Sequence, residues 1–251
     1  MKVGLIGFGN TGKAVASVLI KKENFDLMWV LRKTPKQEKR NVSEILELES
    51  DNESYVYSLE NTNIEKLFDD MPVDVIIDFS SEHGIYSYGE AAADRNIRII
   101  SAISHYDKKE IDFLKELSNK TTVFWSPNIT LGINYLIFAA KALKNIAPFV
   151  DIEIVEEHFR QKHGVSGTAI KMAEALKLKP SQINSVRAGG IVGRHQVIFG
   201  FEYQTIRLTH ESISREAFGN GVTFVAENLM DKPPGYYQYE DVFKPLLKGT
   251  I

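Results

Sequence analysis

Short apolar runs alternate with stretches of helical spacing through the first half of the chain. Runs rich in β-branched residues predict buried strands, and apolar residues recurring every three or four positions predict amphipathic helices. The predicted strands are Lys2–Ile6, Leu27–Leu31, Tyr55–Ser58, Val73–Phe79, Ile97–Ser101 and Thr121–Ser126. The predicted helices are Lys13–Lys22, Val42–Leu48, Ile64–Phe68, Glu82–Arg95 and Tyr106–Asn119. This alternation predicts an α/β fold with a doubly wound parallel sheet, whose ligands bind at the carboxyl ends of the strands.

The pattern changes after Asn128. We expect a long apolar helix over Leu131–Ala147, an extended run over Asp151–Val155 and a helix over Thr168–Leu178. Three β-rich runs then follow without helices between them: Asn184–Val192, His195–Gly200 and Tyr203–His210. Consecutive strands of this kind predict an open mixed or antiparallel sheet, and Ser214–Met230 returns to helical spacing.

Two domains are therefore predicted. Residues 1–128 would form a Rossmann dinucleotide-binding domain, with residues 216–251 returning to it, and residues 129–215 an α+β substrate-binding and oligomerisation domain. We interpret Gly219–Gly221 as the junction where the last helix re-crosses to the first domain. A broad exposed sheet often seals an assembly, so a homo-oligomer is expected.

Composition narrows the class of protein. The chain has 251 residues, 43% hydrophobic and 25% charged, a net charge of −3 and no cysteine. These values are ordinary for a globular protein and argue against nucleic acid as the main partner, a disulfide framework or a thiolate metal site. No apolar run approaches membrane length, and the chain begins directly with a strand, so we expect no membrane partner and a cytoplasmic location. The six histidines lack metal-ligand spacing, so no metal site is expected.

A glycine-rich turn follows the first predicted strand directly. Gly7-Phe8-Gly9-Asn10-Thr11-Gly12 matches the G-x-G-x-x-G dinucleotide fingerprint in its strand–turn–helix context. The first glycine permits the tight turn, the second lets a pyrophosphate approach the backbone, and the third allows close helix–strand packing. The alternative is a glycine-rich turn of another kind of α/β protein.

The second predicted strand ends in Arg32-Lys33. An NAD-specific site has an acidic residue there for the ribose hydroxyls, whereas two cations attract a 2′-phosphate. We therefore predict NADPH as the cofactor, with NADH possible. The alternative is a solvated basic turn.

The stretch from Glu156 to Ala169 is the strongest candidate for chemistry. His158 and Lys162 follow a strand end and are proton-transfer candidates. Ser166-Gly167-Thr168 stands at a helix start, where hydroxyls and backbone N–H groups form an anion site. The alternative is a capped helix after a basic surface loop.

Several motifs in a fixed order carry a resemblance to a known family. They are the N-terminal glycine loop, Asp78-Phe79-Ser80, the stretch 126–134, Glu157-His158 with Lys162 and Ser166–Ala169, Arg187–His195, and Leu208–Glu211 with Arg215 and Phe218. Together they span nearly the whole chain, which resembles the dihydrodipicolinate reductase (4-hydroxy-tetrahydrodipicolinate reductase) family of bacterial lysine and diaminopimelate biosynthesis. The resemblance implies NAD(P)H-dependent reduction of 4-hydroxy-tetrahydrodipicolinate to tetrahydrodipicolinate. It also implies a Rossmann domain, an α+β tetramerisation and substrate domain, and a homotetramer.

The resemblance also implies roles for single residues. His158 falls on the family's proton donor/acceptor and Lys162 on its second proton donor. Phe159, Ser166, Gly167 and Thr168 fall in the part that holds the small dicarboxylate substrate. The cofactor set, from the fingerprint, the strand ends and the resemblance together, is Gly7, Phe8, Gly9, Asn10, Thr11, Gly12, Arg32, Lys33, Phe79, Ser80, Ser101, Ala102, Ile103, Ser126, Pro127, Asn128 and Ile129.

The chain departs from the family pattern near its ligands. Phe159 replaces a second histidine, the loop at Gly164-Val165 is one residue shorter, and Ser101–Ser104 replaces a Gly-Thr-Thr-Gly turn. The nucleotide loop is also slightly compressed. Phe159 either leaves the substrate loosely held, the reading we favour, or turns into the domain interface while the shortened loop brings Arg160 or His163 into that role.

Three functions remain open from the sequence: this reductase, a related reductase of another small carboxylated imine, and a non-enzymatic NADPH-binding sensor. A sensor has no need of two proton donors, so His158 and Lys162 together argue against it. Other dehydrogenases with an N-terminal Rossmann domain are a weaker alternative, because no Glu-Lys-Pro follows the fourth strand.

Overall fold

The structure, a computed structural model, describes residues 1–248 and divides into two compact units. Among the described residues, unit 1 comprises Met1–Ile129 together with residues 218–248, and unit 2 comprises Thr130–Ala217. Each unit encloses hydrophobic residues of its own.

Unit 1 contains a seven-stranded parallel sheet in the order β11-β6-β5-β4-β1-β2-β3. Its strands are β1 (Lys2–Ile6), β2 (Asp26–Arg32), β3 (Tyr55–Ser58), β4 (Val75–Asp78), β5 (Arg98–Ser101), β6 (Thr122–Trp125) and β11 (Gly235–Tyr237). The order runs one way from β1 to β3 and the other way from β4 to β6, so right-handed crossovers place helices on both faces. This is the predicted Rossmann-like sheet, and its strand order reverses between β1 and β4.

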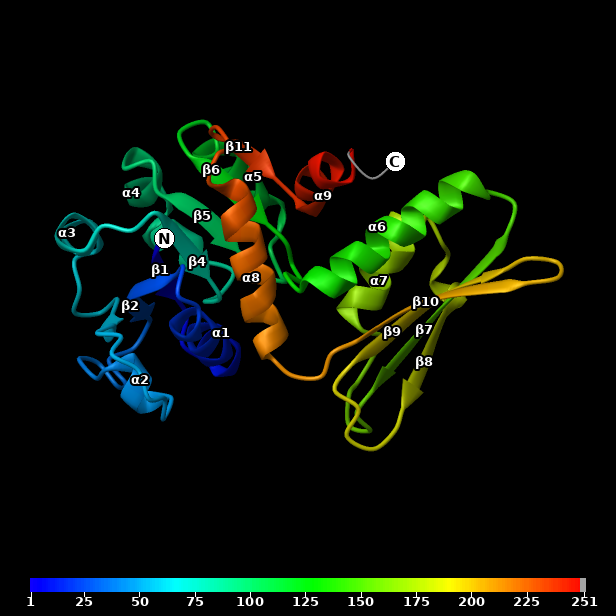
Figure 1. Cartoon of the computed structure of the whole chain (residues 1–251), viewed down its shortest axis with the longest axis horizontal. Coiled ribbons are helices and arrows are strands. Elements are labelled where there is room, and N and C mark those ends of the chain that lie inside the picture. Colours follow the sequence, from blue (N-terminus) through cyan, green and yellow to red (C-terminus); the bar gives the residue numbers. More distant parts are fainter. Residues whose placement is uncertain (249–251) are drawn as a thin grey trace. The chain divides into compact units, whose positions relative to one another are not determined.

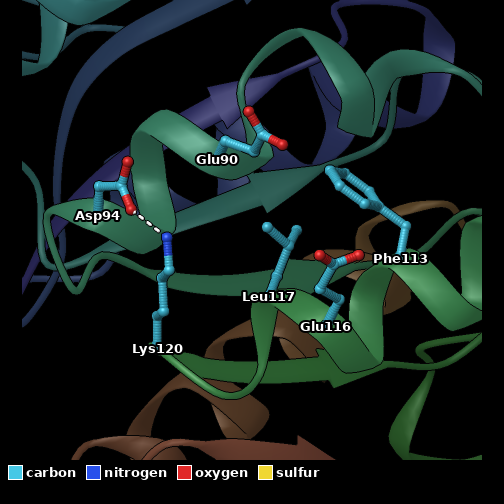
Figure 2. Close-up of a pocket in the computed structure, with 6 residues that line it drawn as sticks. All are labelled: Glu90, Asp94, Phe113, Glu116, Leu117 and Lys120. Atoms are coloured by element: carbon cyan, nitrogen blue, oxygen red, sulfur yellow. Dashed lines mark hydrogen bonds and ion pairs between the residues drawn. The ribbon is translucent and has the colours of Figure 1, made fainter.

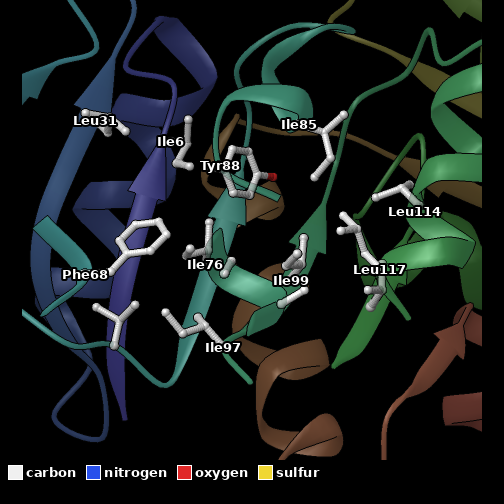
Figure 3. Packing of buried hydrophobic residues seen from close by; sticks show 14 of the residues in the cluster. Ile6, Leu31, Phe68, Ile76, Ile85, Tyr88, Ile97, Ile99, Leu114 and Leu117 are labelled. Atoms are coloured by element: carbon white, nitrogen blue, oxygen red, sulfur yellow. The ribbon is translucent and has the colours of Figure 1, made fainter. Parts of the chain in front are cut away.

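Five helices in the part of unit 1 that precedes residue 129 connect these strands. They are α1 (Asn10–Lys21), α2 (Val42–Ile45), α3 (Ile64–Asp70), α4 (Gly89–Asp94) and α5 (Lys108–Leu117). Apolar residues of α3, α4 and α5 pack against one face of the sheet, and Figure 3 shows Phe68, Leu114 and Leu117 beside the strand residues Ile76 and Ile99. This core fixes the strand ends on which a ligand site can be built.

The predicted helix Glu82–Arg95 is divided in the structure. A single 3-10 turn, η1 (Gly84–Ser87), precedes the short helix α4. Tyr88 separates them with φ −137°, far from helical, because its buried ring is turned inward to bond Asp78. Strand β4 is likewise shorter than predicted, since Asp78 is its last residue.

Helix α8 (Glu216–Leu229) corrects the interpretation of Gly219–Gly221 as a junction. These glycines lie inside the helix. A Cβ atom on Gly219 would lie 2.6 Å from Cβ of Val18 in α1, so the glycine permits close packing of the two helices. Figure 1 shows α8 and α1 beside the sheet, followed by β11 and helix α9 (Tyr239–Leu247), which the sequence pattern did not predict.

Unit 2 is built on a four-stranded mixed sheet in the order β10-β9-β7-β8. The strands are β7 (Asp151–His158), β8 (Ile183–Arg187), β9 (Arg194–Gly200) and β10 (Thr205–Glu211). Pair β7–β8 is parallel, whereas β7–β9 and β9–β10 are antiparallel. The open mixed sheet is therefore present, but the predicted strand Asn184–Val192 ends at Arg187 and continues as a loop to residue 193.

Helices α6 (Leu131–Ile146) and α7 (Gly167–Ala175), with the 3-10 turn η2 (Pro180–Gln182), complete the elements of unit 2. Buried residues of α6 and α7 pack on alternate residues of β7 and β9, including Ile152, Ile154 and Phe199. The same face of β7 continues to Glu156 and His158, which are also buried. Polar groups therefore occupy one end of an otherwise apolar sheet face.

Candidate active site

The glycine loop of unit 1 has the geometry that its fingerprint predicts. Gly7 has φ +95°, and a Cβ atom there would lie 2.5 Å from the backbone of Phe79. A Cβ on Gly12 would lie 2.1 Å from the carbonyl oxygen of Gly7. Only glycine fits these two positions without displacing backbone. The turn is thereby held against the carboxyl end of β4, at the reversal of strand order.

Gly9 leaves room above the start of helix α1. It is the N-cap, it supplies no side-chain cap, and a Cβ atom on it would meet nothing within 4 Å. The N–H groups of a helix's first turn favour an anion. This open N-terminus fits the pyrophosphate of a dinucleotide.

A buried carboxylic group supports the neighbouring strand end. Asp78 accepts hydrogen bonds from Ser80 N (2.8 Å) and from the hydroxyl of Tyr88 (2.8 Å). Burial raises the pKa of Asp78, and hydrogen bonds from Ser80 and Tyr88 oppose this rise. These contacts fix the backbone of Phe79 and Ser80, two of the predicted cofactor residues.

A cleft of about 360 Å³ opens beside this strand end. It is lined by Thr11, Phe79, Ser80, Ser81, Glu82, Ala102, Ile103, Ser104 and His105. Five predicted cofactor residues are therefore brought together: Thr11, Phe79, Ser80, Ala102 and Ile103. Ser101, also a predicted cofactor residue, is the buried last residue of β5, and its hydroxyl lies 2.9 Å from that of Tyr106. The predicted residues Ser126–Ile129 follow β6, where Ser126 Oγ donates to Asn128 O (2.7 Å).

Arg32 and Lys33 lie at the end of β2. Arg32 is half-buried and donates from Nη1 to the carbonyl of Lys36 (3.0 Å), while Lys33 is exposed. Nε of Arg32 is buried and has no hydrogen-bond partner in the described chain. The pair places two cations where a nucleotide's ribose phosphate is bound in this fold.

A second cavity of unit 1, of about 230 Å³, lies between α4 and α5. Figure 2 shows its lining residues Glu90, Asp94, Phe113, Glu116, Leu117 and Lys120. The amino group of Lys120 pairs with Asp94 at 2.6 Å. No predicted site residue lies here, so this groove is separate from the nucleotide site.

In unit 2, His158 is the last residue of β7 and is buried. Its Nδ1 atom forms a hydrogen bond to the carboxylate of Glu156. A carboxylate only accepts, so Nδ1 carries the hydrogen and Nε2 is the lone-pair nitrogen of the neutral ring. Burial lowers the pKa of His158; Glu156 opposes this, and the positive charges of Lys162 and Arg187 add to the lowering. His158 is therefore a neutral base at neutral pH.

Lys162 lies in the loop Phe159–Gly164, which we call the Lys162 loop. Its backbone N–H donates to Phe159 O (3.0 Å), forming a tight turn, and its side chain is half-buried. Its positive charge contributes to the lowered pKa of His158, after the larger effect of burial. Phe159 is 41% exposed and Arg160 and His163 are exposed.

Helix α7 begins at the predicted helix start, and its first turn has the side-chain cap that the alternative interpretation expects. Ser166 is the N-cap, and its Oγ accepts a hydrogen bond from Ala169 N at 3.0 Å. Gly167 is exposed, and a Cβ atom there would meet nothing within 4 Å, so the first turn is open to a ligand. Thr168 follows in the same turn. This arrangement can hold a carboxylate.

Sequence analysis assigned no role to three residues that contact the predicted site residues or one another: Glu156, Arg187 and His195. Glu156 is fully buried and forms an ion pair with Arg187. Separately, Nε2 of His195 lies 2.8 Å from Oγ of Ser166. The rings of His158 and His195 stand edge to face with centroids 5.2 Å apart. For Glu156 the sequence did contain a signal. It is spaced two residues from Ile154, which is two from Ile152, and this alternation indicates that all three side chains lie on the buried face of the strand.

Two further properties bear on the class of protein. Within residues 1–248, no group of three or more His, Cys, Asp or Glu side chains is arranged to hold a metal ion. The same part of the chain contains no helix with the length and apolarity needed to span a bilayer.

Comparison with known proteins then decides the family. The family model described as dihydrodipicolinate reductase, N-terminus, matches residues 1–129, and the model described as dihydrodipicolinate reductase, C-terminus, matches residues 129–243. The chain belongs to the dihydrodipicolinate reductase family. A 4-hydroxy-tetrahydrodipicolinate reductase of Caldanaerobacter subterraneus subsp. tengcongensis is 35% identical over 193 residues, which cover 68% of this chain and 77% of the relative.

Two other relatives extend this comparison. A 4-hydroxy-tetrahydrodipicolinate reductase of Staphylococcus carnosus is 27% identical over 263 residues, covering 96% of this chain and 99% of the relative. The dipicolinate-bound dihydrodipicolinate reductase of Paenisporosarcina sp. TG-14 superposes with a TM-score of 0.79 at 24% identity, covering 95% of this chain and 97% of the other. The latter supports the reductase fold.

These comparisons confirm the predicted reaction and the predicted use of a pyridine nucleotide. The chain is an oxidoreductase that reduces 4-hydroxy-tetrahydrodipicolinate, a step of lysine and diaminopimelate biosynthesis, and unit 1 contains its pyridine-nucleotide-binding domain.

Proposed function

We propose that this reductase uses NADPH in preference to NADH, that Lys162 and His158 manage the proton of the reaction, and that Ser166, Gly167 and Thr168 hold a substrate carboxylate. The observation that carries the proposal is the grouping in unit 2 of a neutral buried His158, the cation of Lys162 and the open start of α7.

The reduced nicotinamide supplies a hydride to an electron-poor carbon of the substrate ring when it is bound. Negative charge that develops on the ring requires a nearby positive charge and a proton. The ammonium group of Lys162 offers both. His158 complements it, because its neutral ring carries hydrogen on Nδ1 and leaves Nε2 to accept a proton and return it.

Substrate binding in the proposal rests on charge. The relative from Paenisporosarcina binds dipicolinate, a dicarboxylate. In this chain the exposed first turn of α7 lies next in sequence to Arg160, Lys162 and His163. A helix N-terminus and basic side chains favour a carboxylate, so we assign a small dicarboxylate to this end of unit 2.

The NADPH preference rests on Arg32 and Lys33 at the end of β2. An arginine can contact phosphate oxygens through two parallel N–H groups, which a ribose hydroxyl cannot match. The unpartnered buried Nε of Arg32 is a donor that a phosphate oxygen can satisfy. NADH would bind without this contact.

One observation favours a second candidate function. The exposed ring of Phe159 offers an apolar surface next to His158, where a residue that can hydrogen-bond would contact a second substrate carboxylate. A related small imine with one carboxylate would tolerate this surface. We therefore propose another carboxylated imine as an additional substrate.

We also propose a cytoplasmic homotetramer assembled through unit 2. The face of its sheet that α6 and α7 leave open contains Val155, Val186 and Ile198 among polar side chains, and Val186 is 43% exposed. An exposed sheet of this kind is commonly covered by another copy. Light scattering of the purified protein tests the tetramer, and a monomer at working concentration contradicts it.

A coupled spectrophotometric assay tests the function. The substrate is generated by the preceding synthase of the pathway, and oxidation of NADPH or NADH is followed by absorbance. We expect rapid oxidation that depends on the synthase product, with the higher kcat/KM for NADPH. A higher kcat/KM for NADH would contradict the proposed nucleotide preference, and turnover of another carboxylated imine would support the additional substrate.

A further inference from the structure

Glu156 is a buried carboxylate with an unusual number of donors. Its side chain is fully buried in β7, and it accepts hydrogen bonds from Arg187 Nη1 (3.0 Å), Arg187 Nη2 (2.5 Å), Ser185 Oγ (2.5 Å) and His158 Nδ1. Burial alone would raise the pKa of Glu156, but hydrogen bonds from Arg187, Ser185 and His158 outweigh it and lower the pKa to about 2. Glu156 is therefore ionised at neutral pH.

Arg187 joins this carboxylate to a different part of the chain. It lies on β8 directly opposite His158 in the parallel pair. Its Nε donates to the carbonyl of Lys162 (3.1 Å), and its Nη2 donates to the carbonyl of Gly164 (2.6 Å). A planar guanidinium with five N–H groups can bind a carboxylate and two carbonyls at once. An ammonium group has neither the number of donors nor the span.

The Lys162 loop depends on few other contacts. Apart from the half-buried Lys162, its residues are exposed, and Gly164 has φ +66° with open space around it. Its backbone also forms the hydrogen bonds Lys162 N to Phe159 O (3.0 Å) and Arg160 N to Gly189 O (3.1 Å). A loop with so little buried surface takes its position from the hydrogen bonds that anchor it. Two of these come from Arg187.

We infer that Arg187 is a positioning residue that sets the place of Lys162 relative to His158. One guanidinium holds the backbone of Lys162 and Gly164 and, through Glu156, fixes the hydrogen of His158 on Nδ1. The two proton-transfer side chains therefore share a single anchor. This role rests on the proposed functions of Lys162 and His158 and adds a residue that touches neither substrate nor cofactor.

Gly193, in the loop just before β9, supports the same arrangement. A Cβ atom there would lie 3.2 Å from Nε2 of His158, closer than ordinary packing allows. Nε2 therefore lies close to the backbone of Gly193, where a side chain would crowd it, while Nδ1 is held by Glu156. The imidazole has Nδ1 fixed as a donor and Nε2 left without a hydrogen, as a proton acceptor requires.

The variant Arg187→Lys in the full chain tests the inference, with Arg194→Lys as its matched control. Arg194 also pairs with a glutamate of β7, Glu157 at 2.7 Å, but lies on the opposite face of the sheet. We expect Arg187→Lys to lower kcat by roughly 10²-fold, the effect of about 1 Å of misplacement, with nucleotide affinity unchanged. We also expect faster amide exchange in residues 160–164. Arg194→Lys should keep the kcat and the exchange of the unmodified protein.

Two results would overturn the role. One is a folded Arg187→Lys protein with normal kcat; the other is a lowered kcat with unchanged exchange in the Lys162 loop. If Arg187→Lys does not fold, Arg187→Gln with Glu156→Gln removes both charges of the ion pair together, and the same two measurements apply. The Lys162→Ala variant distinguishes failure of the proposed active site from failure of the positioning role of Arg187. Normal kcat in Lys162→Ala would contradict the proposed active site itself. A lowered kcat in Lys162→Ala together with a normal kcat in Arg187→Lys would contradict only the positioning role.

Discussion

The hydroxyl of Ser166 lies 2.8 Å from Nε2 of His195, across the space between the start of α7 and strand β9. Ser166 also caps the helix through Ala169 N. His195 is 6% exposed, and burial lowers its pKa to about 4. A neutral histidine thereby orients the residue at the start of the proposed carboxylate site.

Replacing Ser166 should separate capping from binding. Ser166→Ala should lower the free energy of unfolding by about 0.5–2 kcal/mol, as loss of an N-cap does, and raise the KM for the dicarboxylate. Asn63→Ala is the matched control, because Asn63 caps α3 in unit 1 through Lys66 N at 2.9 Å. It should cost similar stability with an unchanged KM. Equal KM values in both variants would remove Ser166 from the substrate site.

Stability should fall on acidification because His195 is buried neutral. The pKa of His195 is lowered from 6.5 to about 4, so between these values the unfolded chain binds a proton that the folded chain does not. The contribution is complete above about pH 6.5 and is lost as the pH falls towards about 4, amounting to roughly 3 kcal/mol. Urea unfolding across this range should show a smaller loss for His195→Gln than for the unmodified protein. Parallel curves for both proteins would contradict this.

The nucleotide preference should depend on the end of β2. Changing Arg32 and Lys33 to Ala removes two charges that attract a 2′-phosphate, so the KM for NADPH should rise about 10- to 100-fold while the KM for NADH changes little. Lys109→Ala, an exposed lysine of α5, is the control. Equal use of both nucleotides by the unmodified protein, together with an unchanged double variant, would contradict the preference.

Phe159 should leave the substrate loosely held. A charge-assisted hydrogen bond to a carboxylate contributes about 1.5–3 kcal/mol, so Phe159→His should lower the KM for the dicarboxylate about 10- to 100-fold with kcat little altered. The ring is 41% exposed, which makes the change compatible with folding. An unchanged KM for the dicarboxylate in Phe159→His would indicate that other residues of the shortened loop bind the substrate.

Much of the fold follows from local pattern. The glycine loop, the alternation of strands and helices and the cap at Ser166 depend on neighbours in sequence, and the structure has all three. Helix α4 did not follow, because the inward turn of Tyr88 towards Asp78 is a tertiary contact. The same reason applies to β8, which ends at Arg187 where its side chain turns to Glu156 and the Lys162 loop.

The candidate site divides in the same way. His158, Lys162 and Ser166–Thr168 lie close together in sequence, so their types and spacing indicate chemistry. Glu156 and Arg187 are 31 residues apart and meet only through the pairing of β7 with β8. Charged residues on a strand normally indicate its exposed face. Only the register between β7 and β8 shows that Glu156 and Arg187 come into contact. A glutamate in phase with Ile152 and Ile154 was the single local sign that a buried partner was needed.

Turnover of the Lys162→Ala variant is the most direct test of the proposed mechanism. With saturating NADPH and the synthase product, we expect kcat to fall by roughly 10²–10⁴-fold, as loss of an acid–base group does, while the Kd for the nucleotide stays unchanged. His158→Ala should also lower kcat. A Lys162→Ala protein that binds nucleotide normally and retains nearly full turnover would contradict the assignment of the active site to this end of unit 2.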